Sequence, residues 1–181
     1  MPPLTLHNYA TPLGEMAALF SPRGLCLLEF STATARLARE WRDVERHAGA
    51  PAVAGEDART RALGAQIEAY FAGRLRQFDV ALDLVGTPFQ QQVWRALLAI
   101  PFGQTWSYAQ EAAHIGRPSA TRAVAAANGQ NKVSIVVPCH RVIGSNGRLT
   151  GYGGGLPRKQ WLLALEAAGA PPRDLLQAVE A

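Results

Sequence analysis

The chain has 181 residues, of which 48% are hydrophobic, a mean hydropathy of −0.03 and a net charge of +4. These values are typical of a globular protein with one large or two small domains. No apolar run approaches the roughly 18 residues of a membrane-spanning helix, and the N-terminus lacks the features of a signal peptide. Two cysteines, Cys26 and Cys139, are too few for a disulfide framework, so a reducing, cytoplasmic setting is expected.

Charge divides the chain near residue 84. Residues 1–84 hold nine Arg and ten acidic residues, a balance of −1, whereas residues 85–181 hold nine basic and four acidic residues, a balance of +5. We therefore predict an N-terminal domain over 1–84 and a C-terminal domain over 85–181. The second is the place expected for a polyanionic partner, although charge that serves only solubility is an open alternative.

The first domain is expected to mix helices and strands. Alternating apolar residues over 16–20, a Pro-Arg-Gly turn and an apolar run from Leu25 predict a β-hairpin. Apolar residues at helical spacing predict helices over 37–48 and 63–71, each ending near a glycine. Residues 78–84 alternate between apolar and polar side chains, which predicts a half-exposed strand.

The second domain begins with a helix-start signal. Thr87 suits the N-cap, Pro88 the first helical position, and Gln90 completes a capping box. Further along, residues 107–129 predict two short Ala-rich helices hinged at Gly116, with Pro118 beginning the second. This pattern fits a helix-turn-helix, but it also fits an ordinary helical hairpin.

The stretch IVVPCHRVIG places Cys139 between a proline and two basic residues. A thiol attacks only as thiolate, and neighbouring cations or a base favour that form. His140 can serve Cys139 directly only if the backbone turns there, because adjacent residues of a strand point to opposite faces. The alternatives are a small core residue or half of a metal site. No other Cys or His shows metal-ligand spacing, so no metal is predicted.

Two features follow the cysteine. Residues 151–155 hold four glycines around Tyr152, a loop that either lets a ligand approach the backbone or acts as a flexible linker. Pro157 begins a helix in which Leu162, Leu163 and Glu166 share an apolar stripe. A carboxylate there is costly unless paired, so Glu166 either orients His140 or is a boundary residue bonded to the backbone.

The segments NKVSIVVPCHRVIG and TGYGGGLPRKQWLLALE resemble the O6-alkylguanine-DNA alkyltransferases, a family of direct-reversal DNA repair proteins, in its bacterial single-subunit form. The resemblance runs from about residue 87 to 167. It implies an α+β fold: an N-terminal mixed α/β domain with an antiparallel, ribonuclease H-like sheet, and a mainly α-helical, winged-helix-like domain with a helix-turn-helix. It also implies irreversible, stoichiometric transfer of the alkyl group from O6-alkylguanine in DNA to Cys139, without a cofactor. Activity on O4-alkylthymine is left open.

The same resemblance implies roles for individual residues. Arg122 matches a finger that enters the duplex and replaces the flipped base, and Tyr108 matches a phenol that protonates the leaving guanine. Asn131 matches a brace of the active-site turn, while His140 and Glu166 match a water-mediated relay to the thiol. The remaining expected residues are Ser119, Ala123, Ala126 and Arg141 for DNA contact, and Pro138, Val142, Tyr152 and Gly153 for the substrate pocket.

The expected partner is double-stranded DNA, bound through the minor groove without sequence preference by a monomer that does not contact membranes. An Ala-lined helix can lie close to a narrow groove, and sequence-independent binding relies on basic charge. Lys132 stands where many relatives carry proline, so a looser turn is expected. Two rivals remain: a DNA-binding regulator in which Cys139 is structural or redox-sensing, and a cysteine hydrolase with many turnovers.

Overall fold

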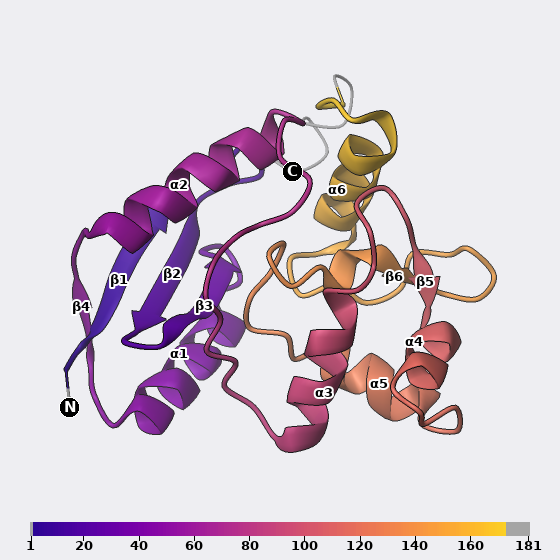
Figure 1. Ribbon diagram of the computed structural model, residues 1–181, viewed down its shortest axis with the longest axis horizontal. Coiled ribbons are helices and arrows are strands. Elements are labelled where there is room, and N and C mark those ends of the chain that lie inside the picture. The colour runs from indigo at the N-terminus through magenta and orange to yellow at the C-terminus, as the bar shows by residue number, and fades with distance from the viewer. Residues whose placement is uncertain (1, 173–181) are drawn as a thin grey trace.

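A four-stranded sheet and two long helices lie within residues 2–71, and shorter helices follow between residues 88 and 168 (Figure 1). The structure is a computed structural model and describes residues 2–172. In chain order the elements are β1 (Leu4–Tyr9), β2 (Met16–Ser21), β3 (Gly24–Phe30), α1 (Thr34–Ala48), β4 (Ala52–Ala54), α2 (Ala58–Phe71), α3 (Pro88–Leu97), β5 (Trp106–Ser107), α4 (Tyr108–His114), α5 (Thr121–Asn128), the 3-10 turn η1 (Cys139–Arg141), β6 (Val142–Ile143) and α6 (Leu156–Ala168).

The sheet has the strand order β3-β2-β1-β4. The predicted hairpin of β2 and β3 is confirmed, and β1 also pairs antiparallel with β2. The expectation of a wholly antiparallel sheet is wrong, because β4 runs parallel to β1. The reason is topological: β3 runs in the same direction as β1, and α1 carries the chain back before β4 begins. The mixed α/β fold class is confirmed, whereas its ribonuclease H-like and winged-helix descriptions stay predictions.

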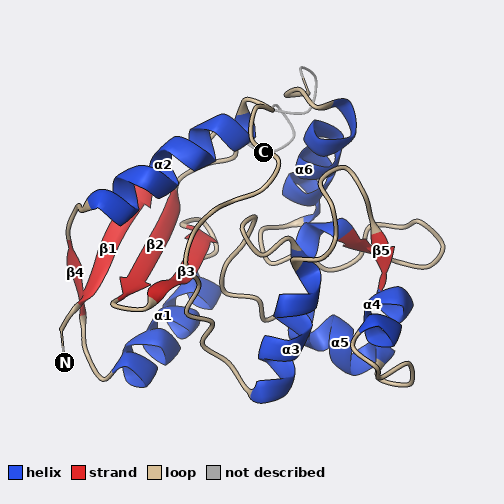
Figure 2. Ribbon diagram, in the orientation of Figure 1, coloured by secondary structure: helices blue, strands red, loops and turns tan. Residues whose placement is uncertain are grey.

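Helices cover both faces of the sheet (Figure 2). On one face Val44 of α1 packs with Leu19 and Leu27. On the other, Leu63 of α2 packs in a cluster with Phe20. All six residues of β2 are therefore buried, so the hydrophobic alternation expected of a half-exposed strand does not apply there.

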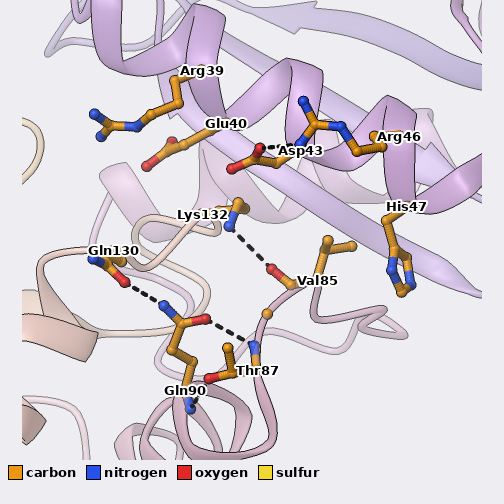
Figure 3. Close-up of a pocket in the computed structure, with 11 residues that line it drawn as sticks. Arg39, Glu40, Asp43, Arg46, His47, Val85, Thr87, Gln90, Gln130 and Lys132 are labelled. Carbon is orange, nitrogen blue, oxygen red and sulfur yellow. Dashed lines mark hydrogen bonds and ion pairs between the residues drawn. The ribbon is translucent and has the colours of Figure 1, made fainter.

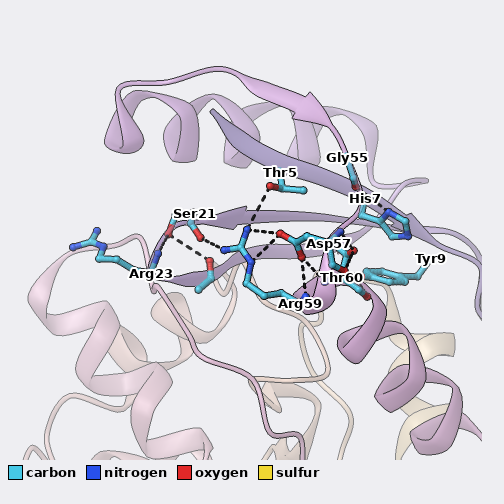
Figure 4. Close-up of polar contacts among 10 residues, drawn as sticks. Thr5, His7, Tyr9, Ser21, Arg23, Gly55, Asp57, Arg59 and Thr60 are labelled. Atoms are coloured by element: carbon cyan, nitrogen blue, oxygen red, sulfur yellow. Dashed lines mark hydrogen bonds and ion pairs between the residues drawn. The ribbon is translucent and has the colours of Figure 1, made fainter. Parts of the chain in front are cut away.

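The start of α2 is fixed by a capping box and an arginine (Figure 4). The Asp57 carboxylate accepts hydrogen bonds from the backbone N–H groups of Arg59 and Thr60, which have no partner inside the helix. The Arg59 guanidinium pairs with Asp57 at 2.7 Å and donates to the carbonyl oxygen of Ser21 at 2.7 Å. This contact ties the helix start to the end of β2.

The predicted strand over 78–84 is wrong. Burial alternates along it as expected, but only Leu82 forms a bridge, to Leu25 at the start of β3. The rest of that edge of β3 is occupied, because Leu28 bonds to the backbone of residues 132 and 134. Residues 132–134 therefore attach the segment that precedes Cys139 to the sheet.

The helical part begins as the sequence indicates. Thr87 caps α3 and exchanges both capping-box bonds with Gln90. The turn at Gly116 is present, with a φ of 73°, but the second helix begins at Thr121 rather than at Pro118. Residues 117–120 instead form a further turn. The short parallel pair of β5 and β6 was not anticipated.

One core joins the sheet to the later helices. Phe30 of β3, Trp94 of α3 and Trp161 of α6 belong to one cluster of buried side chains. The predicted domain boundary at residue 84 therefore crosses a shared core and stays a prediction. Within residues 2–172 no helix is long and apolar enough to cross a membrane. The C-terminal end of the predicted second domain, residues 173–181, lies outside the described residues.

We expect Asp57→Ala to lower the free energy of unfolding by about 1 kcal/mol, because two N-terminal N–H groups of α2 lose their acceptor. Asp57→Asn keeps an accepting oxygen and should cost less. Urea unfolding of the two variants beside the unmodified protein measures both effects. Equal losses would mean that the charge pairing with Arg59, rather than capping, stabilises this helix start.

Candidate active site around Cys139

The loop that leads to Cys139 is strained and held from inside. Ile135 has a φ of 72° and is the only non-glycine residue within 2–172 with a positive φ, a conformation that costs on the order of 1–3 kcal/mol. The buried Asn131 side chain offsets this cost. Its amide donates to the carbonyl oxygen of Val137 at 2.9 Å, and its oxygen accepts from the N–H of Val133 at 3.0 Å. Asn131 thus closes the loop across the strained residue.

The backbone turns at the cysteine. After Pro138, residues Cys139–Arg141 form a 3-10 turn closed by a bond from the N–H of Arg141 to the carbonyl oxygen of Pro138 at 3.0 Å. The strand geometry that would place Cys139 and His140 on opposite faces is therefore absent from this segment. The backbone turn that a direct role of His140 would require is therefore present.

The Cys139 thiol is 8% exposed, and its Sγ accepts a hydrogen bond from the Asn131 amide at 3.2 Å. Burial raises the pKa of the thiol to about 11, although the Asn131 bond and the charge of Arg36 act in the opposite direction. At pH 7 only about one thiol in ten thousand would then be ionised. Reaction at Cys139 therefore requires a base that takes the proton as the sulfur attacks.

His140 is fully buried and meets the requirements for such a base. Its Nε2 lies 2.7 Å from Oε1 of Glu166. Burial lowers the pKa of the imidazole despite this partner, so the ring is neutral at pH 7. We assign the proton to Nε2, which donates to Glu166 and leaves Nδ1 as an acceptor. Nδ1 has no hydrogen-bond partner among the described residues. Within those residues, no hydrogen bond joins the His140 ring to Sγ of Cys139.

Glu166 is 4% exposed and ionised. Burial alone would raise its pKa, but hydrogen bonds from His140 and Arg141 and the Arg141 charge hold the pKa far below its usual range. Its Oε2 accepts from Nε of Arg141 at 2.8 Å and from the N–H of Gly103 at 3.2 Å. Both readings of Glu166 from the sequence therefore apply: it orients His140, and it bonds to the backbone.

Tyr70 completes this arrangement from the N-terminal part of the chain. Its hydroxyl donates to Oε1 of Glu166 at 2.7 Å. Burial and the neighbouring carboxylate raise the pKa of Tyr70 well above its usual value, so it stays a donor. Sequence reasoning treated Tyr70 only as an apolar position of α2, and nothing in its local pattern separates it from a core residue.

Arg141 does not lie where the sequence suggested. We expected a DNA contact, but its side chain is 9% exposed and both ends of its guanidinium are engaged inside the protein. It pairs with Glu166 and donates to the carbonyl oxygen of Ile100 at 2.7 Å. A buried carboxylate requires a counter-charge, and Arg141 provides it. We therefore assign Arg141 to the site and not to the surface.

Tyr108 stands at the start of α4 and faces the glycine loop. Its hydroxyl donates to the carbonyl oxygen of Thr150 at 3.2 Å. Burial raises its pKa, so the phenol keeps its proton at pH 7. Lys159, which the sequence did not single out, donates to the same carbonyl at 2.8 Å and to that of Val142 at 2.5 Å. One buried ammonium thus ties the glycine loop to β6.

The structure places the expected pocket residues in separate regions. Val142 is buried, and Tyr152 and Gly153 are half-buried in the glycine loop. The Tyr152 ring lies 6.5 Å from that of His140, and a Cβ on Gly153 would displace the Arg36 guanidinium. Pro138 instead lines a cavity of about 170 Å³ whose lining does not include Cys139.

The helix α5 presents the side chains expected at its surface. Arg122, Ala123 and Ala126 are exposed along one side, as is Ser119 in the preceding turn. Val124 and Ala127 face the core. The exposed side therefore combines one long cation with small residues.

A larger pocket lies elsewhere. A hollow of about 770 Å³ opens between α1 and the start of α3, and charged side chains of both signs line it (Figure 3). None of the expected site residues contributes to its lining. Pocket size therefore does not identify the chemistry of this protein, which follows from the arrangement around Cys139. Among residues 2–172 there is also no group of three Cys, His, Asp or Glu that could hold a metal ion.

We expect Tyr70→Phe to lower the free energy of unfolding by about 1.5–3 kcal/mol, because it removes a hydrogen bond to a charged group. The matched control is Tyr9→Phe, since the Tyr9 hydroxyl donates to the neutral carbonyl of Thr60 at 2.8 Å and should be worth only about 0.5–1.5 kcal/mol. Urea unfolding at pH 7 measures both. A loss for Tyr70→Phe no greater than for the control would contradict an ionised Glu166.

The chain is similar in sequence to known proteins. The model of the 6-O-methylguanine DNA methyltransferase DNA-binding domain matches residues 88–168. The methylated-DNA–protein-cysteine methyltransferase of Mycobacterium tuberculosis is 62% identical over 106 residues, and the match spans 59% of this chain and 64% of that protein. The Salmonella typhimurium protein of the same name is 46% identical over 162 residues, which cover 88% of this chain and 94% of that protein.

The chain is also similar to solved structures. The crystal structure of Mycobacterium tuberculosis OGT in complex with DNA has a TM-score of 0.80 at 42% identity and covers 96% of this chain and 99% of that one. The archaeal O6-methylguanine-DNA methyltransferase of Pyrococcus kodakaraensis has a TM-score of 0.59 at 25% identity, with 90% and 98% covered. With one relative 46% identical over nearly its whole length, the chain belongs to the methylated-DNA–protein-cysteine methyltransferase family.

Proposed function

We propose that this protein repairs DNA by moving the alkyl group of O6-alkylguanine to Cys139. The observation that carries the proposal is a buried thiol beside a neutral His140, which an ionised Glu166 holds in place. Sγ of Cys139 attacks the alkyl carbon, the bond from that carbon to guanine O6 breaks, and a thioether forms. The restored guanine leaves, and the electron pair of the broken bond stays with it.

Two protons move in this reaction. His140 takes the thiol proton through Nδ1, by way of a water, and Glu166 stabilises the imidazolium. Tyr108, whose raised pKa keeps the phenol protonated at pH 7, gives its proton to the guanine as the bond to O6 breaks. The phenolate then recovers the proton that His140 took from the thiol, so the thiol proton is in effect passed to the guanine. The sulfur of a thioether is a poor leaving group, so the alkyl group stays on Cys139 and each molecule acts once.

The proposed partner is double-stranded DNA, entered from the minor groove without sequence preference. A stacked base must be flipped out before Cys139 can reach it, at a cost of a few kcal/mol. The exposed side of α5 supports this, because small Ala123 and Ala126 allow close approach while Arg122 can fill the space of the flipped base. Basic charge in the second half of the chain supports backbone-driven binding. A monomer in the cytoplasm remains our expectation.

The two rival functions explain less of the site. A regulator with a structural cysteine gives no reason to bury an ionised Glu166 against His140 and Arg141. A cysteine hydrolase would release an acyl group from a thioester at Cys139 with water, and it therefore predicts many turnovers instead of one alkyl group per protein.

Incubation with a duplex that carries one O6-methylguanine should add one methyl group per protein, on the peptide that contains Cys139. Intact-mass measurement followed by peptide mapping tests this. Cys139→Ser should show no transfer, because a hydroxyl is a much poorer nucleophile under the same activation. Cys26→Ser is the matched control and should keep transfer, since Cys26 lies in the core and donates to the carbonyl oxygen of Leu19. Methyl on Cys139→Ser protein would overturn the proposal.

Arg122→Ala should slow repair of a duplex by about tenfold or more, which corresponds to about 1.4 kcal/mol of lost base-flipping support. Reaction with free O6-benzylguanine should change little, because that substrate needs no flipping. Arg61→Ala, which removes an exposed arginine of α2, serves as the control and should affect neither reaction. Equal losses on both substrates would exclude the finger role of Arg122.

A further inference from the structure

A second acid is buried in the protein, away from the Cys139 relay. Glu111 of α4 is 0% exposed, and its Oε2 accepts a hydrogen bond from the Asn128 amide at 2.6 Å. Asn128 is the last residue of α5 and is 7% exposed. This bond therefore connects the two helices on either side of the turn at Gly116.

The same two side chains leave one oxygen each without a partner. Oε1 of Glu111 and Oδ1 of Asn128 are both buried and have no hydrogen-bond partner among the described residues. As long as the carboxyl group is ionised, both oxygens are acceptors only, and neither can satisfy the other. Two buried acceptors without donors, on two side chains that are already bonded to each other, are energetically costly. A proton on the Glu111 carboxyl group would supply the donor.

Charged neighbours do not compensate the negative charge that an ionised Glu111 would carry. Only desolvation and the Asn128 bond act on its titration. On α3, Arg95 is exposed and bonded to Gln91. On α5, Arg122 is exposed, and β5 and β6 hold no titratable residue. On α4 itself, the exposed His114 lies against Trp106, and the negative charge of Glu111 would raise the pKa of Tyr108.

We propose that Glu111 is a neutral carboxylic acid that forms a two-point pair with the Asn128 amide and clasps α4 to the end of α5. The amide N–H donates to one carboxyl oxygen, and the carboxyl O–H donates to the amide oxygen. One proton thus satisfies both unpaired oxygens, and no counter-ion is needed. The pair fixes the relation of Tyr108, on α4, to Arg122, on α5. In the repair reaction Glu111 is thus a positioning residue, and that role rests on the proposed function.

The clasp makes the helix pair sensitive to pH. Burial raises the pKa of Glu111 to about 7, against about 4.3 in an unfolded chain. Because the folded pKa is the higher one, the stabilisation is complete below about pH 4.3 and is lost as pH rises to about 7. Above that range Glu111 is ionised, and neither Oε1 of Glu111 nor Oδ1 of Asn128 has a donor among the described residues.

The direct test is carbon-13 NMR of the Glu111 carboxyl group in the unmodified protein, assigned by its loss in Glu111→Gln. The signal should stay at the position of the neutral acid until the pH approaches 7. Titration near the ordinary value of about 4.3 would overturn the proposal. This measurement needs neither DNA nor transfer to Cys139, so failure of the repair function would leave its outcome unchanged.

Glu111→Gln tests the consequence, because the glutamine amide can make both bonds to Asn128 without a titrating proton. If only the clasped form holds α5 in place, the unmodified protein should bind one undamaged duplex about tenfold more weakly at about pH 8 than at about pH 6. Glu111→Gln should remove that loss. Glu68→Gln, which removes an exposed acid of α2, should keep it. The same tenfold loss in all three proteins would refute the clasp.

Discussion

The Glu166 carboxylate has to be buried and ionised at the same time, and much of the structure meets that requirement. Its oxygens accept hydrogen bonds from α2, from the 3-10 turn and from the backbone after α3. An isolated buried charge would be too costly to retain, but a paired and fully bonded one is not. The carboxylate therefore connects, through hydrogen bonds, elements that are far apart in the sequence.

Burial and hydrogen bonding together set the protonation state of each group in the resting site. Burial keeps the Cys139 thiol protonated and His140 neutral, while the bonds from His140 and Arg141 keep Glu166 charged despite it. The thiolate is therefore scarce in the resting site, and under the proposed function the proton leaves the thiol only as Sγ attacks the substrate.

Local structure was largely readable from the sequence. The capping box of Thr87 and Gln90, the glycine that ends α1 and the β2–β3 hairpin depend on residues within a few positions of one another. Errors arose where distant segments compete. Residues 78–84 have the alternation of a strand, yet they form a single bridge because residues 132–134 occupy the same edge of β3. No pattern within 78–84 records that competition.

The motif around Cys139 by itself suggested a nucleophile and a base, which stay a proposal, because Cys139 and His140 are adjacent in the chain. Only the tertiary structure decided the rest. Tyr70 resembles any core residue of a helix, and Arg141 resembles a surface cation, until folding brings both to Glu166. A hydrogen bond to a buried charge requires a donor–acceptor distance of about 3 Å. Which side chains come that close is decided by the packing of elements that are far apart in the sequence.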